Sequence, residues 1–293
     1  MRYLYIIGNG FDIAHGIKSG YSHYKEWLKD NNKSLFDQLN AAYNDDEAWW
    51  GNFEENLSTI DVDKYKAYNI SNYKGVTERE LFGTMESIRW CPTASQISDL
   101  YKRMIDSFDN WVSSLRIGKQ KRKFKLKKRS AFFLTFNYTN TLEVLYKVPK
   151  RKVFHIHGQA NSNEKLVLGH GMDENMLFDL YKRKHGFSDD YELNEDTQNV
   201  IDQVARLHKP VRCILFKNRK RFETLVNVKR INIIGFSFSE IDMDYLDWVV
   251  EHHKQSNGVK WKVTWHTEED KIKIQSFFEK HHIHTRNYKL VRK

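Results

Sequence analysis

The sequence predicts an α/β protein in which a parallel β-sheet carries helices on both faces. Apolar runs of strand length, such as Tyr3–Ile7 and Ala131–Phe136, alternate with stretches of helical periodicity. Continuous apolar runs are typical of strands buried on both sides, as in the middle of a parallel sheet. Ligands of such sheets bind beyond the carboxyl ends of the strands, so we look for functional residues there.

The first strand is expected at Tyr3–Ile7, where a Gly-Asn-Gly turn ends the apolar run. From Tyr21 the chain has few prolines and many aromatic residues at helical intervals, which predicts a mostly helical insertion over 21–130. Aromatic residues at this spacing are far more often the buried side of a helix than the lining of a pocket.

The sheet resumes with a strand at Ala131–Phe136, and the sequence Asn140-Thr-Leu-Glu143 predicts a capping box that starts a helix. Short strands are expected at Lys152–Ile156 and Leu166–Leu168. The charged, glycine-poor stretch 172–228 predicts a second helical insertion.

The carboxyl-terminal part continues the alternation, and Ser239 with Asp242 forms a second capping-box sequence. We therefore expect a single domain over 1–293, with its core in 1–20 and 131–293. The remaining predicted elements are strands at Arg230–Ile234, Lys260–Trp265 and Ile283–Tyr288, and helices at 239–250 and 268–280.

The chain is basic, with 48 Lys and Arg against 38 Asp and Glu, a formal net charge of +10. Nucleotides, nucleic acids and acidic proteins are all compatible partners. Part of the excess is local, because Lys119–Arg129 reads KQKRKFKLKKR. The run is typical of a solvated loop before a buried strand, and it is also compatible with a phosphate-binding patch.

The cysteines Cys91 and Cys213 are far apart and lack a CxxC spacing, so neither a disulfide framework nor a thiolate zinc site is indicated. We expect a reducing, cytoplasmic location. No apolar run is long enough to predict a membrane span, and we expect no membrane partner.

Histidines and carboxylates could supply nitrogen and oxygen ligands to a metal, but they show no recognised ligand spacing, and we predict no metal. These residues are His155, His157, His170, Asp242 and Asp244.

The first motif is Gly8-Asn9-Gly10-Phe11-Asp12, at the end of the first predicted strand. Its glycines would let backbone amides approach a phosphate or ribose, and Asp12 could bind ribose hydroxyls. The third glycine of the dinucleotide fingerprint is missing, which disfavours an ordinary hydride-transfer site. A purely structural turn, with Asp12 as a cap, explains the motif equally well.

Two further motifs follow predicted strands. Thr135 and Asn137 lie in TFNYT, where the Asn137 amide could face a ligand or a water, or satisfy its own turn. His155 and His157 lie two apart on a predicted strand ended by Gly158, so their side chains should share a face. His157 is a candidate general base, although a lone histidine is more often a structural hydrogen bonder.

The fourth motif, GFSFSEID, ends the strand at 230–234. Gly235, Ser237 and Asp242 could contact a cofactor phosphate or ribose. A plain strand-to-helix turn, with Asp242 in its cap, needs the same residues.

Taken together, the segments YIIGNGFDIAHGI, FLTFNYTNTLE, VFHIHG with LVLGHG, and INIIGFSFSEIDMDYL resemble the AbiH family, which is associated with abortive infection and defence against bacteriophage. The resemblance covers Tyr3 to about Tyr24 and Phe132 to about Val249. One departure is Phe236, where histidine is more common in the family pattern.

AbiH proteins are in turn distantly similar to sirtuin-like defence modules, which bind NAD on a Rossmann-like sheet and in several cases hydrolyse it. The resemblance implies that Asn137 orients water and that His157 accepts a proton. Thr139 stands where many of these modules have aspartate. The chain lacks the structural zinc module of sirtuin deacylases, so protein deacylation is not expected. The implied nucleotide loops contain Gly8, Gly10 and Asp12, and Gly235, Ser237 and Asp242.

The sequence is therefore compatible with three functions. The first is an antiphage effector that binds NAD or a related nucleotide, as an NAD glycohydrolase in its catalytic form. The second is a nucleic-acid-binding protein or metal-dependent nuclease that uses residues 119–129. The third is a nucleotide-gated module whose insertions bind a phage or host protein, and a homo-oligomer is compatible with each.

Overall fold

The computed structural model of the chain describes residues 3–43, 47–71, 93–186, 188, 195–225, 228–253 and 258–293. Cys91, named above, lies outside these residues, and Cys213 is exposed. Residue contacts divide the chain into two compact units. The sheet unit comprises residues 1–20, 112–167 and 210–293, and the helical unit comprises 21–111 and 168–209.

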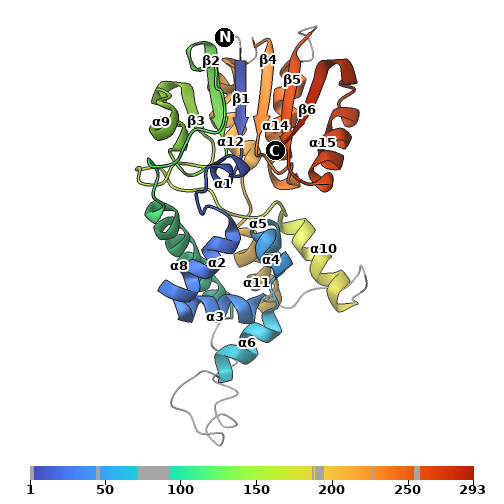
Figure 1. The fold of residues 1–293 in the computed structure, drawn as a ribbon. Helices are drawn as coiled ribbons and strands as arrows, with labels where there is room; N and C mark the ends of the chain where they lie inside the picture. The colour runs from blue at the N-terminus through green and yellow to red at the C-terminus, as the bar shows by residue number, and fades with distance from the viewer. Residues whose placement is uncertain are drawn as a thin grey trace, which may run out of the picture. The chain divides into compact units, whose positions relative to one another are not determined.

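The sheet unit contains a six-stranded, all-parallel sheet among the described residues, in the order β3-β2-β1-β4-β5-β6 (Figure 1). This is the doubly wound order of Rossmann-like folds, and it confirms the predicted α/β class. The strands are β1 (Tyr3–Ile7), β2 (Ala131–Thr135), β3 (Val153–His155), β4 (Arg230–Ile234), β5 (Lys260–Trp265) and β6 (Tyr288–Arg292).

Each face of the sheet has its own core, because side chains alternate along the strands. Leu4 and Ile6 of β1 belong to one cluster, whereas Tyr5 and Ile7 belong to the other. The Leu4 face is covered by α12 (Val211–Lys217), α13 (Arg219–Glu223), α14 (Met243–His253) and α15 (Glu268–Lys280). The Tyr5 face is covered by α1 (Gly10–Ala14), α9 (Thr141–Tyr146) and part of the segment 115–127.

The helical unit is held together by aromatic side chains, as their helical spacing predicted. Trp50 and Phe53 stack with ring centroids 5.4 Å apart, and the ring centroids of Tyr24 and Trp111 are 5.1 Å apart. Lys209 is fully buried, and Glu54 neutralises its charge with 2.6 Å between Lys209 Nζ and Glu54 Oε2. The helices are α2 (Tyr21–Asn31), α3 (Lys33–Ala42), α4 (Glu47–Gly51), α5 (Phe53–Asn56), α6 (Val62–Ser71), α8 (Thr93–Ser114, which ends in the sheet unit), α10 (Glu174–His185) and α11 (Glu195–Ala205).

Several predicted elements differ from the structure. Leu166–Leu168 is not a strand, and the Val167 N–H donates to the His157 carbonyl in the turn after β3. The last strand begins at Tyr288, where Ile283 was expected. Helix α8 ends at Ser114, and residues 115–127, which were expected in the helical insertion, are neither helix nor strand.

Both predicted capping boxes are also wrong. Asn140 precedes α9 and Ser239 precedes the 3₁₀ turn Glu240–Asp242, but neither side chain makes a capping hydrogen bond. Their acidic partners, Glu143 and Asp242, face histidines instead. No described helix has the length and apolar character needed to cross a membrane.

Candidate functional site

The turns that follow β1 and β4 pack backbone against backbone through their glycines. The Gly10 N–H donates to the Gly235 carbonyl at 2.8 Å, and the Gly8 N–H donates to the Ile234 carbonyl at 3.0 Å. A Cβ atom on Gly8 would lie 2.5 Å from the Gly235 oxygen, and one on Gly235, whose φ is +65°, would lie 2.2 Å from the Phe11 nitrogen. The glycines are therefore needed for this contact, which supports the structural reading of the first motif.

The other residues of the first motif divide between core and turn. The Phe11 side chain is fully buried and stacks on Phe124 with ring centroids 5.2 Å apart. The Asn9 amide donates to the Ser19 carbonyl at 2.9 Å and accepts from the Ser19 hydroxyl at 2.6 Å. A ligand contact by Phe11 would therefore have to come from its backbone.

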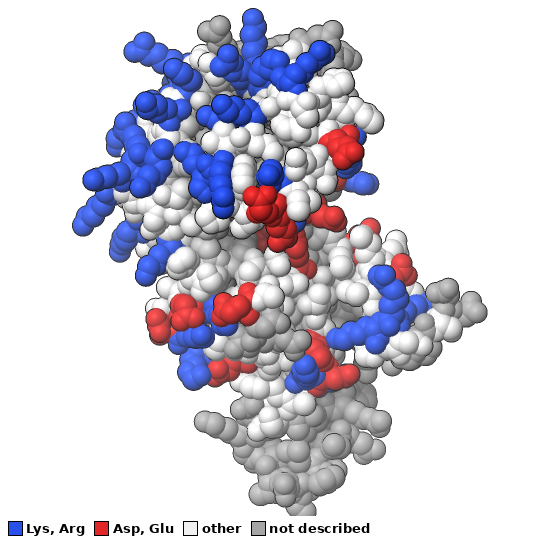
Figure 2. All heavy atoms as spheres, turned by 45° about the vertical axis from the view of Figure 1, so that its right-hand side comes forward, with Lys and Arg blue, Asp and Glu red and all other residues white. Residues whose placement is uncertain are grey.

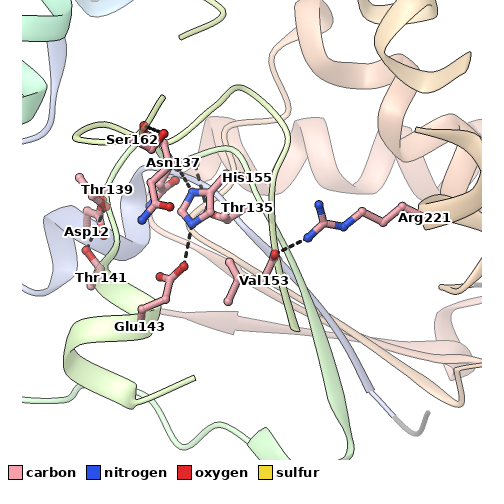
Figure 3. A network of polar contacts seen from close by, with 11 residues as sticks. Asp12, Thr135, Asn137, Thr139, Thr141, Glu143, Val153, His155, Ser162 and Arg221 are labelled. Carbon is pink, nitrogen blue, oxygen red and sulfur yellow. Dashed lines mark hydrogen bonds and ion pairs between the residues drawn. The ribbon is translucent and has the colours of Figure 1, made fainter. Parts of the chain in front are cut away.

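Asp12 is the centre of a buried polar network at the carboxyl edge of the sheet (Figure 3). Its side chain is 0% exposed and accepts a short hydrogen bond from the Thr139 hydroxyl, which lies 3.0 Å from that of Thr141. Burial raises the pKa of Asp12 to about 6, although hydrogen bonding by Thr139, Thr141 and Asn137 and the charge of His155 oppose the rise. No described group reaches the second oxygen, Oδ1, with good hydrogen-bond geometry.

Through this hydrogen bond, Thr139 holds the Asp12 carboxylate at the edge of the sheet. It stands where many sirtuin-like modules have aspartate, and its hydroxyl donates to the carboxylate of Asp12 in α1, the helix that follows β1.

Asn137 lies directly beyond β2 and is 6% exposed. Its N–H donates to the Thr135 hydroxyl at 3.1 Å, which fixes the backbone at the strand end. The side-chain oxygen is buried, and within the described part of the chain it has no hydrogen-bond partner. A buried acceptor without a donor is costly, so this atom suits a ligand donor or a water.

His155 forms the third part of the network, together with Glu143 of α9. Its Nδ1 atom lies 3.0 Å from the Asn137 carbonyl, and its Nε2 atom lies 2.9 Å from Glu143 Oε1 (Figure 3). A carbonyl only accepts, so Nδ1 carries a hydrogen and donates it. The Nε2–Oε1 contact needs a second proton, held by either the imidazole or the carboxyl group.

His157 has a different environment. Strand β3 ends at His155, so the two histidines do not share a face as predicted. His157 is 2% exposed, lies among the rings of Phe136 and Tyr245, and approaches Asp242 with 3.4 Å between Nε2 and Oδ1. The HIHG and GFSFSEID motifs therefore meet at this pair.

The remaining predicted residues lie around the turn after β4, except Gly158, which follows β3. Ser237 is exposed, whereas Phe236 is buried and lies 4.7 Å from the Phe136 ring. Packing thus replaces any polar role at the position where the family pattern has histidine more often. After β3, Gly158 has φ +84°, and a Cβ atom there would lie 2.6 Å from the Lys165 carbonyl oxygen.

A cavity of about 380 Å³ lies beside the Asp12 network within the sheet unit. Thr139, Asn140 and Val144 line it from the β2–α9 side, and Arg116 and Asn161 line it from neighbouring segments. Its volume lies within the range of small-molecule sites. Thr139 joins the cavity to Asp12 because its hydroxyl donates to the buried carboxylate.

Sequence reasoning missed Glu143, Arg116 and the roles of His155 and Thr139. Glu143 carried a signal, an acidic residue three positions after Asn140, but the same spacing also fits a helix cap. Among the described residues, no group of three His, Cys, Asp or Glu side chains is arranged to hold a metal ion.

Comparison with known proteins supports the family resemblance. Residues 4–265 match the family model described as Bacteriophage abortive infection AbiH. A search of curated proteins finds no match. A structure from the work entitled "Structural Basis for the Mechanism and Regulation of Sir2 Enzymes" is similar at 10% identity and a TM-score of 0.27, over 92% of this chain and 83% of that one.

Proposed function

Since the chain belongs to the bacteriophage abortive infection AbiH family, we propose that it acts in abortive infection by binding and hydrolysing NAD or a related nucleotide. The site would be the edge formed by β1, β2 and β3. The observation that carries the proposal is the buried carboxylate of Asp12, whose hydrogen-bond donor Thr139 also lines a cavity of about 380 Å³.

The polar groups of this edge match a ribose. Ribose hydroxyls are hydrogen-bond donors, and the Oδ1 atoms of Asp12 and Asn137 are buried acceptors that no described residue reaches with good hydrogen-bond geometry. Arg116, exposed at the cavity, supplies a cation for a phosphate group. The glycine turns after β1 and β4 bind each other, so the phosphates would lie beside Arg116.

Hydrolysis would break the bond between the ribose carbon and the nicotinamide nitrogen, and the bonding electrons would neutralise the pyridinium ring. A water oxygen would bond to the same carbon and release one proton. Asp12, with a pKa of about 6, is mostly ionised at neutral pH and suits a general base. Asn137 would orient the water or the ribose.

His157 is the other candidate proton acceptor. Its contact with Asp242 would stabilise the imidazolium that forms when it takes a proton. Its burial among Phe136 and Tyr245 means that a proton would have to reach it through a bound water.

The test is NAD consumption by the purified full chain. We expect Asp12→Asn to lower the rate at least about 100-fold, the usual contribution of a positioned acid–base group. Asn137→Ala should lower it by a similar factor of about 100 because the water or ribose is no longer oriented. Asn163→Ala, at an exposed loop position, is the matched control and should leave the rate unchanged. A rate that increases with pH through about 6 would identify Asp12 as the base, whereas loss only in His157→Ala would favour His157.

Binding is measured separately from turnover. Saturating NAD should raise the thermal midpoint of the wild type and not that of Asp12→Asn. Binding without turnover would reduce the role of the site to nucleotide recognition. Equal NAD consumption by all variants would show that the chemistry, if any, occurs elsewhere.

A further inference from the structure

A second feature of the sheet unit is a continuous line of cations, which the nucleotide site does not use. We call it the basic ridge, and it consists of Lys119–Arg129 together with Lys147, Lys150, Arg151 and Lys152. Residues 112–167 contain 14 Lys and Arg against two acidic residues, Glu143 and Glu164. Glu143 is turned toward His155, so it does not neutralise the ridge.

The backbone of the ridge is held in place by hydrogen bonds. The Tyr146 hydroxyl accepts from the N–H groups of Lys123 at 3.1 Å and Phe124 at 3.0 Å. The Tyr5 hydroxyl accepts from the Lys127 N–H at 3.1 Å. Phe124 and Leu126 pack toward the core on the Tyr5 face of the sheet, so the alternate side chains between and beside them face solvent.

The two parts of the ridge are joined side by side. Lys152 Nζ donates to the carbonyls of Lys128 at 3.0 Å and Arg129 at 2.7 Å. Lys128 Nζ donates to the Tyr146 carbonyl at 2.7 Å, and Arg122 Nε donates to the Leu145 carbonyl at 2.5 Å. These bonds use neutral acceptors, so the positive charges remain uncompensated.

The charge is concentrated in the sheet unit. This unit carries 33 Lys and Arg against 13 Asp and Glu, a formal net charge of +20, whereas the helical unit carries 15 against 25, which is −10. No ridge cation is ion-paired with a described residue, although such pairs occur elsewhere in the unit, as between Lys280 and Asp247. Lys and Arg side chains crowd over the sheet-containing part in Figure 2.

We propose that the basic ridge binds the sugar–phosphate backbone of single-stranded nucleic acid, independently of the nucleotide site. Exposed lysines recur at every second residue from 119 to 127, in a segment that is neither helix nor strand, so they present a row of cations to solvent. A row of phosphates along a nucleic-acid strand is the complementary charge pattern. Neutralising several phosphates in a row gives affinity with little dependence on base sequence.

A membrane surface fits the ridge less well. Peripheral membrane binding combines cations with apolar side chains that enter the lipid. The apolar residues within the ridge, Phe124 and Leu126, pack inward. Among the described residues, the exposed large apolar side chains are Ile13, Met176, Phe216 and Ile272, none of which belongs to the ridge.

The experiment measures fluorescence anisotropy of labelled single-stranded RNA and DNA of about 20 nucleotides with the full chain. A ridge variant replaces each of Lys119, Lys121, Lys123, Lys125 and Lys127 by Gln. We expect it to bind at least about 100-fold more weakly in roughly 50 mM salt and to reduce the slope of log affinity against log salt by about 3. The matched control replaces Lys217, Lys220, Lys229, Lys262 and Lys289, all exposed in the same unit, by Gln.

The control variant should bind within about threefold of the wild type, because long-range attraction alone is weak once salt screens it. Equal losses in the two variants, no binding by the wild type, or ridge-dependent binding to anionic lipid vesicles in place of nucleic acid would each overturn the proposal. A second variant, Lys147→Gln with Lys150→Gln and Arg151→Gln, leaves residues 119–129 unchanged. It should still weaken binding about tenfold, which excludes misfolding of segment 119–129 as the cause.

Discussion

Asp12 couples the site to pH through its burial. Its pKa is raised from 3.8 to about 6 in the folded protein, so the folded state binds a proton more tightly than the unfolded state. The protonated carboxyl therefore contributes stability that is fully present below pH 3.8 and is lost as pH rises through about 6. The ionised carboxylate that catalysis would use is the less stable form.

We expect this coupling to be visible in unfolding experiments. Between pH 5 and pH 7.5 the free energy of unfolding of the wild type should fall, relative to that of Asp12→Asn, by about 1.4 kcal/mol. Asn keeps the size of the side chain and does not ionise, so it serves as the reference. Urea unfolding at the two pH values measures the difference, and an unchanged difference would contradict the buried, raised Asp12.

The contact between His155 and Glu143 leads to a prediction about the stability of two Glu143 variants. Glu143→Ala leaves His155 Nε2 buried without a partner, which should cost about 1–3 kcal/mol of unfolding free energy. Glu143→Gln should cost less than about 1 kcal/mol, because an amide N–H can donate to the neutral Nε2 atom. Urea unfolding compares the two variants, and equal losses would show that Glu143 acts only through packing.

At the residue scale, the sequence predicted where residues lie relative to strands better than which residues they contact. The motifs correctly placed Asn137 beyond a buried strand. Glu143 and Asp242 were assigned to helix caps, because local spacing reports only on neighbours along the chain. Their histidine partners are set by the pairing of β2 with β3 and by the turn after β4, neither of which local spacing can supply.

At the element scale, strands β1, β4 and β5 and helix α15 have the predicted bounds, because each is a strongly patterned run with clear ends. Strand β6 was placed too early because it is an edge strand without fully buried side chains, so its apolar pattern is weak. The irregular segment 115–127 could not be predicted either. Tyrosine hydroxyls from β1 and α9 hold its backbone, in place of a regular ladder.

The contact between the turns after β1 and β4 can be tested with Gly→Ala substitutions, each of which adds one methyl group. Gly8→Ala would put a Cβ atom 2.5 Å from the Gly235 carbonyl oxygen, so backbone must shift, and we expect a loss of at least about 2 kcal/mol in unfolding free energy. Gly51→Ala in α4 meets no atom within 4 Å and should stabilise by about 0.5–1 kcal/mol. Chemical unfolding measures both, and a tolerated Gly8→Ala would mean that the two turns can separate.

At the scale of the whole molecule, the net charge of +10 conceals two units of opposite sign. Composition could not show this separation, because the helical unit is assembled from two segments, 21–111 and 168–209, that lie far apart in the sequence. The predicted fold class was correct, yet the distribution of charge depends on which segments fold together.

The separation predicts how salt acts on stability. At low ionic strength the charges of the sheet unit repel one another, and this repulsion is screened as the Debye length falls from about 30 Å at 0.01 M to about 8 Å at 0.15 M. Over that range we expect the thermal midpoint of the wild type to rise by about 2–4 °C, which corresponds to about 1 kcal/mol. Scanning calorimetry at the two ionic strengths measures this rise.

Two matched variants show which unit the charge repulsion comes from. The ridge variant removes five cations from the sheet unit, so it should have a higher midpoint than the wild type at low salt and a smaller rise with salt. Replacing five exposed lysines of the acidic helical unit by Gln should instead lower the low-salt midpoint, because it increases repulsion and breaks the Lys29–Glu26 and Lys33–Asp37 pairs. Identical responses of the two variants would show that only the total charge matters. The five lysines are Lys29, Lys33, Lys64, Lys66 and Lys102.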